Sequence, residues 1–374
     1  MRLDWYRRPG SGSRPAPGLK GAEGQAGRRP AAFRAPAPDI PGRFRHRRLV
    51  AARVGIMALG LLGGCAAPRP YGKPGAPLKR LGDEIVVCGQ LFHTGAPVVL
   101  WTDPGGYDAY RAHCHFNPDR WPASKPASDE PVRYGSWRQH LPEDVAQRVR
   151  QEGWSLPALQ QAVDLFVIHY DACGTSRRCF EVLHDLRGLS VHFMLDLDGT
   201  IYQTLDLKER AWHAGTANDR SVGVEIANIG AYEDPAVLEQ WYGRDARGRA
   251  YVTLPAALGP AGLRTPGFVA RPRRNEVLSG QINGRRLYQY DLTAAQYESL
   301  IKLTATLCRV LPRIRPDYPR DAEGRLRTTV LTADEMSRFS GLLGHWHVTE
   351  QKVDPGPAFD WDGLVAEVKK ILRR

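Results

Sequence analysis

The second half of the chain alternates between short apolar runs and stretches with helical periodicity. Runs of β-branched and aromatic residues bounded by turn residues are typical of buried strands, and Asp-Gly between two such runs favours a tight hairpin. The strands predicted in this way are residues 165–169, 191–196, 201–203 and 221–228, with a hairpin turn at Asp198-Gly199.

Helices are predicted between and after these strands. Thr293 with Gln296 forms a capping-box pattern, after which apolar residues recur at helical spacing as far as Leu307. A last helix is predicted over residues 361–372, with basic residues at its C-terminal end, and another begins near Ser176. The alternation predicts an α/β fold, with a mixed central β-sheet flanked by α-helices, over residues 161–374.

Two segments are harder to interpret. Residues 81–160 are predicted to be an N-terminal extension packed on this domain, with short strands at 84–88 and 97–101 around a turn. Residues 231–290 form a long insertion rich in Gly and Pro, to which few periodic elements can be assigned. Such an insertion is either a lid or binding surface, or a plain surface loop.

The N-terminal region has a different composition. Residues 1–64 hold 13 Lys and Arg against 3 Asp and Glu, so +10 of the net charge of +12 lies there. The remainder is close to neutral, so no basic nucleic-acid face is required and no nucleic-acid partner is expected. The first 47 residues show no hydrophobic periodicity and are predicted to be a disordered or misannotated leader.

A secretory signal follows this leader. Basic residues from Arg47 precede a short apolar run and Leu62-Gly63-Gly64-Cys65, which indicates a signal peptide with translation starting close to Val50. The last four residues resemble a bacterial lipobox, which implies cleavage before Cys65 and lipidation of its thiol. Residues 65–80 would then be a proline-rich tether. Ala66 suggests, by analogy with lipoprotein sorting, an outer-membrane protein of the bacterial envelope that faces the periplasm.

Three residues form a candidate metal site. His345 and Asp354 lie nine positions apart beside a proline-containing loop near the C-terminus, and His169 ends the apolar strand 165–169. Two imidazoles and a carboxylate are zinc-ligand types, and a catalytic zinc usually takes three protein ligands and keeps one position for water. His347 is the alternative to His345, because two residues that are two apart on a strand share a face.

Several short blocks carry a family resemblance. They occur in one order along the chain: Val167-Ile168-His169-Tyr170, Ser190-Val191-His192-Phe193, residues 198–203, Ala211-Trp212-His213-Ala214-Gly215, residues 222–228 and residues 352–361. Together they resemble the zinc-dependent N-acetylmuramoyl-L-alanine amidases, which include peptidoglycan recognition proteins, over roughly residues 164–372. The spacing between His345 and Asp354 is nine positions, one fewer than the family pattern, so His347 stays open as the ligand.

The resemblance implies roles for other residues and a Zn²⁺ cofactor. Glu225 would be the general base and later the acid, and Lys352 would stabilise the oxyanion. Contacts with substrate are expected from Tyr170, Trp212, His213 and Asn228. His192 would pack beneath the site, and His184 is expected on a helix surface.

The resemblance also implies a disulfide between Cys173 and Cys179, because a pair with this spacing recurs in peptidoglycan recognition proteins. Thiols outside the cytoplasm can pair, but sequence does not fix connectivity. Cys88 with Cys114 is a second candidate pair. Cys308 would be a buried thiol in an apolar helix.

The resulting interpretation is a zinc amidase that cleaves the bond between N-acetylmuramic acid and L-alanine in peptidoglycan or muropeptides. We expect a monomer that is held at a membrane by its lipid anchor. Two alternatives remain open: a non-catalytic peptidoglycan-binding lipoprotein, and a zinc peptidase that acts within the stem peptide.

Overall fold

The computed structural model describes residues 74–119, 133–256 and 261–374. The predicted leader, the signal peptide, Cys65 and most of the tether lie outside the described residues. In the part that is described, no helix is both long enough and apolar enough to cross a membrane.

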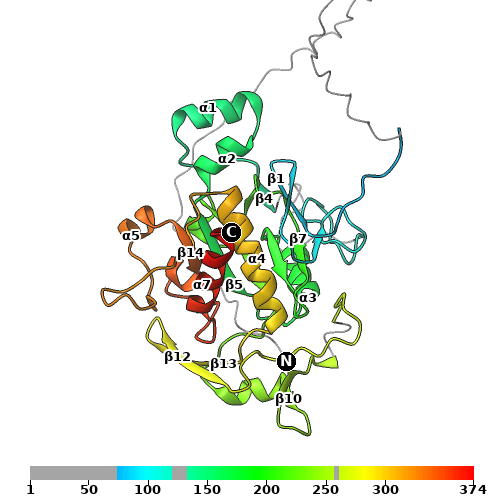
Figure 1. Cartoon of the computed structure of the whole chain (residues 1–374), viewed down its shortest axis with the longest axis vertical. Coiled ribbons are helices and arrows are strands. Elements are labelled where there is room, and N and C mark those ends of the chain that lie inside the picture. The colour runs from blue at the N-terminus through cyan, green and yellow to red at the C-terminus, as the bar shows by residue number, and fades with distance from the viewer. Residues whose placement is uncertain (1–73, 120–132, 257–260) are drawn as a thin grey trace, which may run out of the picture. The chain divides into compact units, whose positions relative to one another are not determined.

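A six-stranded mixed sheet forms the centre of the domain (Figure 1). Its strands, in spatial order, are β14 (Gly341–Gly344), β5 (Leu165–Tyr170), β9 (Ser221–Ile226), β6 (Phe193–Leu195), β7 (Ile201–Gln203) and β3 (Val98–Leu100). The first four run parallel, β7 is antiparallel to β6, and β3 is parallel to β7. The carboxyl ends of the four parallel strands therefore meet at one edge, where α/β sheets commonly bind ligands.

Helices cover both faces of this sheet, which confirms the predicted α/β class. One face packs with α4 (Ala294–Val310) and α7 (Trp361–Leu372) in a single apolar core, to which β5 contributes Phe166 and Ile168. On the other face, α3 (Ser176–Phe180) contributes Phe180 to a cluster with Met194 of β6. The capping box predicted for α4 is present, with Thr293 and Gln296 each bonded to the other's backbone.

The residues preceding β5 are integral to the domain. The expected strands near 84 and 97 exist, but β1 (Glu84–Val87) pairs with β2 (Gln90–His93), whereas β3 pairs with β7. The expectation that the two strands lie around a single turn is therefore wrong, because each strand pairs with a different partner. The aperiodic stretch also contains a helix that the sequence did not indicate, α1 (Glu143–Glu152), followed by α2 (Leu156–Ala162).

The insertion is more regular than its sequence indicated. It contains two hairpins, β10 (Tyr242–Arg244) with β11 (Ala250–Val252), and β12 (Leu278–Ile282) with β13 (Arg285–Gln289). The remaining elements are short. They are β4 (Tyr134–Gly135), β8 (Arg210–Ala211), α5 (Ala333–Arg338), α6 (His345–Val348), a π-helical turn at Glu181–Leu186, and 3₁₀ turns at Gly215–Ala217 and Pro235–Gln240.

Candidate metal centre

The carboxyl edge of the parallel strands carries the candidate site. His169 is the penultimate residue of β5 and pairs in register with Glu225 on β9. Gly344, the last residue of β14, pairs with Ile168, so His345 emerges level with His169. Residues opposite one another on neighbouring strands project to the same face, so this sheet edge gathers all three side chains. Asp354 then joins them from the loop after α6.

His169, His345 and Asp354 converge on one point. The Nδ1 atom of His169 lies 2.8 Å from Oδ2 of Asp354 and 3.0 Å from Nδ1 of His345, and His345 Nδ1 lies 3.1 Å from the same Oδ2. Ligands of a tetrahedral zinc at bond lengths of 2.0–2.1 Å stand about 3.3 Å apart. The three donor atoms are thus arranged at nearly the separation that zinc requires.

The charge states of these groups also suit a cation. Burial, followed by the nearby His345, lowers the pKa of His169 to about 4, so this imidazole is neutral at physiological pH. Burial opposes ionisation of Asp354, but His345 and His169 hold the pKa of this carboxyl well below its usual range. Neutral imidazole and ionised carboxylate are the forms in which these side chains bind metal. The residues therefore fit a zinc ion on their chemistry as well as their geometry.

His347 lies outside this cluster. Its Nδ1 accepts a hydrogen bond from Gly344 N at 2.9 Å, and its Nε2 lies 2.7 Å from the carbonyl oxygen of Arg327. Residues 345–348 form the short helix α6 rather than a strand, and two residues that are two apart on a helix point in nearly opposite directions. The strand assumption that kept His347 open is wrong, and the structure gathers His345 instead.

His213 stands behind His169 rather than in an open cleft. Nε2 of His169 lies 3.0 Å from Nδ1 of His213, whose own Nε2 lies 3.3 Å from the Ser221 hydroxyl. The ring rests on Gly223, where any Cβ would collide with it. His213 therefore contacts a candidate ligand, which the sequence did not indicate, and its contact with substrate stays a prediction.

Glu225 lies beside the candidate ligands. Val222, Val224 and Ile226 of the same strand belong to the main apolar core, so Glu225 projects to the opposite face of the sheet. The side chain is mostly enclosed but keeps some solvent exposure. Burial, and then the negative charges of Asp354 and Asp171, raise its pKa well above the usual range. A carboxyl group with a raised pKa is suited to exchanging protons near neutral pH.

Lys352 is half-buried two residues before Asp354. Its positive charge acts on both His169 and Glu225, lowering the pKa of each as a secondary contribution. An ammonium group therefore stands near the candidate metal centre, as expected.

The other proposed substrate contacts divide into two kinds. Asn228 is buried and uses its side chain internally, accepting from Gly230 N at 2.8 Å and donating to the Tyr290 carbonyl at 3.3 Å. Tyr170 packs against the main core, with its ring on Gly230. The structure thus gives both of these residues packing roles. Trp212 is half-buried, and its contact with substrate stays a prediction.

The cysteines form no disulfide among the described residues. The bridge implied for Cys173 and Cys179 is not made, although Cys173 is close enough to help raise the pKa of the buried Cys179 thiol, after desolvation by burial. The suggested Cys88–Cys114 bridge is likewise not formed. Cys308 is buried within α4, as expected.

Two further histidines are buried. His192 lies beneath the site as expected, where its Nδ1 accepts from Gly223 N at 3.2 Å. His184 was expected on a helix surface but is only 1% exposed, with its Nδ1 lying 2.6 Å from Asp185 Oδ1. The irregular π-helical turn that carries it could not be anticipated from α-helical spacing.

A second group with ligand-type side chains occurs at Asp83, Glu84 and His93. Asp83 accepts from Gly95 N at 2.9 Å and lies 2.8 Å from His93 Nδ1. Glu84 accepts from the amides of Leu81 and Gly82. These carboxylates are engaged in shaping the β1–β2 region, so the group does not resemble a prepared metal site.

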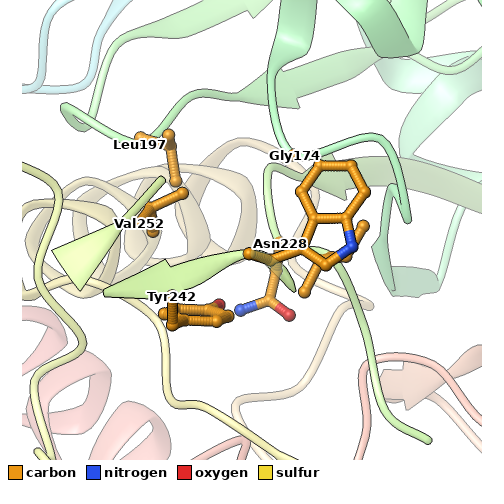
Figure 2. A pocket seen from close by; sticks show the side chains of 7 residues that line it. Gly174, Leu197, Asn228, Tyr242 and Val252 are labelled. Atoms are coloured by element: carbon orange, nitrogen blue, oxygen red, sulfur yellow. The ribbon is translucent and has the colours of Figure 1, made fainter. Parts of the chain in front are cut away.

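A small pocket opens near the carboxyl ends of β6 and β9, without any of the candidate ligands in its lining (Figure 2). Leu197 and Asn228 follow those two strands, and Tyr242 and Val252 come from the first hairpin of the insertion. The full lining is Gly174, Leu197, Asn228, Ile229, Trp241, Tyr242 and Val252. The insertion therefore contributes three of the seven residues that line this pocket, beside the carboxyl edge of the sheet.

A mixed α/β sheet that gathers two imidazoles and a carboxylate at its carboxyl edge, next to a protonatable glutamate, has the features of a metal-dependent hydrolase. The model of the N-acetylmuramoyl-L-alanine amidase family matches residues 159–357, which is more than half of the chain. The chain belongs to this family. It is accordingly an N-acetylmuramoyl-L-alanine amidase, an enzyme that hydrolyses the amide between N-acetylmuramic acid and L-alanine.

Parts of several solved amidase structures also match this chain. A selenomethionine derivative of AmpD is 20% identical, with a TM-score of 0.28, and the match covers 56% of this chain and 86% of that one. AmiD from E. coli, in complex with anhydro-N-acetylmuramic acid-L-Ala-D-γ-Glu-L-Lys, is 20% identical with a TM-score of 0.31, over 55% of this chain and 57% of that one.

The endolysin amidase LysCS from Clostridium intestinale URNW is 16% identical, with a TM-score of 0.30, over 56% of this chain and 86% of that one. No curated protein matches the chain. The family assignment rests on the family match.

Proposed function

We propose that this amidase uses a zinc ion held by His169, His345 and Asp354, and that it acts on peptidoglycan or its muropeptide fragments. The observation that carries the proposal is the convergence of two Nδ1 atoms and one carboxylate oxygen within 3.1 Å of one another, beside Glu225. When bound, zinc would acidify a water molecule and polarise the scissile carbonyl.

His213 would fix the protonation of His169. With its Nδ1 facing the metal position, His169 carries its proton on Nε2 and donates it to Nδ1 of His213 at 3.0 Å. The proton on Nε2 of His213 then points to the Ser221 hydroxyl. Such outer partners select the tautomer and orient the ring of a metal-binding histidine.

Glu225 would move the protons of the reaction. As a carboxylate it takes a proton from the attacking water, and as a carboxylic acid it returns that proton to the nitrogen of the departing L-alanine. Burial and the neighbouring carboxylates raise its pKa, which favours the carboxylic acid that protonates the departing nitrogen. Lys352 would place its positive charge near the carbonyl oxygen as negative charge develops there, a contribution of about 3 kcal/mol for one well-aimed donor.

The ligand set is tested by zinc analysis of purified variants. We expect one zinc per chain in the natural protein, and its loss in His169→Ala, His345→Ala and Asp354→Ala. His347→Asn keeps an acceptor at the Nδ1 position and is the matched control, so it should retain zinc. Zinc lost in His347→Asn but kept in His345→Ala, with both variants folded, would reverse the assignment of the second ligand.

We propose further that the enzyme is a lipoprotein of the bacterial cell envelope, anchored at Cys65 in the outer membrane and facing the periplasm. The sequence pattern from Arg47 to Ala66 supports this localisation. Labelled fatty acid should be incorporated by the natural chain and not by Cys65→Ser. Equal labelling of the two chains would refute the anchor.

A further inference from the structure

The second hairpin of the insertion contacts the loop that carries Lys352 and Asp354. We call residues 345–358 the metal loop. Asn283 lies at the turn between β12 and β13, with a φ of +48° that Asn tolerates better than most residues. Its side-chain amide donates to the carbonyl oxygens of Glu350 at 3.1 Å and Lys352 at 3.2 Å. The turn of this hairpin is therefore fastened to the backbone of Lys352 itself.

Asn283 is in turn held by the segment before α5. Its Oδ1 accepts from Val330 N at 2.9 Å, and its own backbone N–H donates to the Thr328 carbonyl at 2.9 Å. The amide is thus oriented with its oxygen toward Val330 and its N–H groups toward the metal loop. A third carbonyl, that of Trp346, lies 3.5 Å from the same nitrogen.

Gln289, at the far end of β13, holds the opposite end of the metal loop. This side chain is 1% exposed, donates to the Pro355 carbonyl at 3.0 Å and accepts from Ala358 N at 3.0 Å. Gly356 has a φ of +89°, and any Cβ at this position would collide with the Gln289 amide. Arg274, just before the hairpin, also donates to the Ala358 carbonyl.

We infer that Asn283 and Gln289 are positioning residues, through which the insertion fixes the metal loop and aims Lys352 and Asp354 at the reacting bond. Between α6 and α7 the metal loop has no regular secondary structure, so its carbonyls need donors from elsewhere. The hairpin supplies these donors on both sides of Asp354. Small displacements of catalytic groups greatly reduce activity, so hydrogen bonds that hold the metal loop on both sides of Asp354 are expected to matter for turnover.

This inference rests on the proposed roles of Lys352 and Asp354, and it gives the insertion a specific task. A merely stabilising hairpin would lower the melting temperature when weakened and would leave the local exchange of the metal loop in the native state unchanged. A positioning hairpin, by contrast, controls the order of the metal loop and the turnover number together.

The test uses Asn283→Asp and Asn283→Gly in the full chain. Aspartate has nearly the same shape, tolerates the positive φ and still accepts from Val330 N, but it cannot donate to the carbonyls. Glycine removes the side chain without backbone strain. Arg286→Ala is the matched control, because this exposed side chain makes its hydrogen bonds within the hairpin, to Tyr288 and Ser279.

We expect both Asn283 variants to show faster amide hydrogen exchange across residues 349–358 and a kcat lowered about 10- to 100-fold on a muropeptide, while KM changes little. Arg286→Ala should match the natural protein in both measurements. Unchanged exchange of the metal loop in both Asn283 variants would overturn the inference. The inference would also be overturned if Arg286→Ala lowered kcat as much as the Asn283 variants do.

Hydrogen exchange also separates this inference from the proposed function. If Lys352→Ala keeps full activity, the proposed role of that lysine fails, while faster exchange of the metal loop in the Asn283 variants would still demonstrate the brace. Gln289→Met, which keeps the volume but loses the hydrogen bonds, should loosen residues 354–358 in the same way.

Discussion

His169 uses both of its ring nitrogens, and this single residue links the candidate metal centre to the protein interior. Nδ1 meets Asp354 and His345, while Nε2 meets His213. A neutral imidazole carries one N–H proton. A hydrogen-bond acceptor beside one nitrogen therefore keeps the proton there and leaves the lone pair of the other nitrogen free to bind a metal. The strand position of His169 was evident from the sequence. The partner on its far side was not, because His213 is 44 residues away along the chain.

Replacing His213 should therefore weaken zinc binding without removing a ligand. We expect His213→Ala to lower the affinity for zinc about 10- to 100-fold, because the Nε2 proton of His169 loses its acceptor. His213→Asn places an oxygen near the former Nδ1 and should recover part of the affinity. Competition with a chromogenic chelator measures both values. Zinc affinity in His213→Ala equal to that of the natural protein would contradict the orienting role.

At the scale of elements, α4 offers a direct test of local sequence signals. Thr293 caps this helix by accepting from Gln296 N at 3.0 Å, and its hydroxyl also donates to the Leu197 carbonyl at 2.8 Å. We expect Thr293→Ala to lower the free energy of unfolding by about 1–2 kcal/mol, and Thr293→Ser to restore most of it. Urea denaturation provides the measurement. Equal stability of the Ala and Ser variants would show that the cap contributes nothing.

Elements with a strong local signal were predictable, and elements defined by distant partners were not. β5 is an unbroken apolar run, and α4 has both a capping box and helical periodicity, so both appeared in the sequence. The β12–β13 hairpin is short and only partly buried, and its hydrophobic pattern is weak. Its link to the site consists of the contacts that Asn283 and Gln289 make with the metal loop.

The choice between His345 and His347 shows the same limit within the site. Residue types and spacing identified the loop, and the resemblance favoured His345. The decision itself depends on whether Gly344 is followed by strand or helix, since that sets which imidazole faces His169. A four-residue helix is too short to show a periodic pattern, so only the folded chain distinguishes the two.

At the scale of the whole molecule, the segment before residue 160 completes the fold. β3 is a strand of the central sheet, and Ile85, Val87, Val98 and Leu100 belong to the main apolar core. The guanidinium of Arg138 is fully buried and donates to five backbone carbonyls between residues 207 and 221. The catalytic domain therefore cannot be separated at the boundary that composition suggests.

Truncation tests this dependence. A chain that starts at residue 159, where the family match begins, should fail to give a cooperative thermal transition. The truncation exposes one edge of the apolar core and removes Arg138, the donor to five buried backbone carbonyls. A chain that starts at residue 74 should melt like the full-length protein. Cooperative melting and normal activity of the shorter chain would show that the preceding segment is dispensable.

The two buried histidines His192 and His347 should make the free energy of unfolding depend on pH. Burial lowers the pKa of His192 to about 3 and that of His347 to about 3, from 6.5 in an unfolded chain. Below pH 6.5 the unfolded chain binds protons that the folded protein excludes. Burying these imidazoles in their neutral form therefore carries no penalty above pH 6.5. As the pH falls from 6.5 toward 3, the free energy of unfolding decreases by about 1.4 kcal/mol per pH unit for each histidine.

Urea titrations between pH 7 and pH 4 measure this slope. The double variant His192→Gln with His347→Asn cannot bind these two protons and should show a shallower decline. Identical slopes for the natural and variant proteins would exclude these two residues as its source.

In the proposed mechanism, His169, His345, Asp354 and Glu225 together cleave the amide between N-acetylmuramic acid and L-alanine. Mass spectrometry of the products from purified muropeptides or sacculi tests it most directly, with the zinc-loaded natural protein compared with zinc-loaded Glu225→Gln. We predict that the natural protein releases stem peptides that begin with L-alanine, and that the variant keeps its zinc but turns over about 10²- to 10⁴-fold more slowly. Shortened stem peptides, no product from the zinc-bound natural protein, or undiminished turnover by Glu225→Gln would contradict the account.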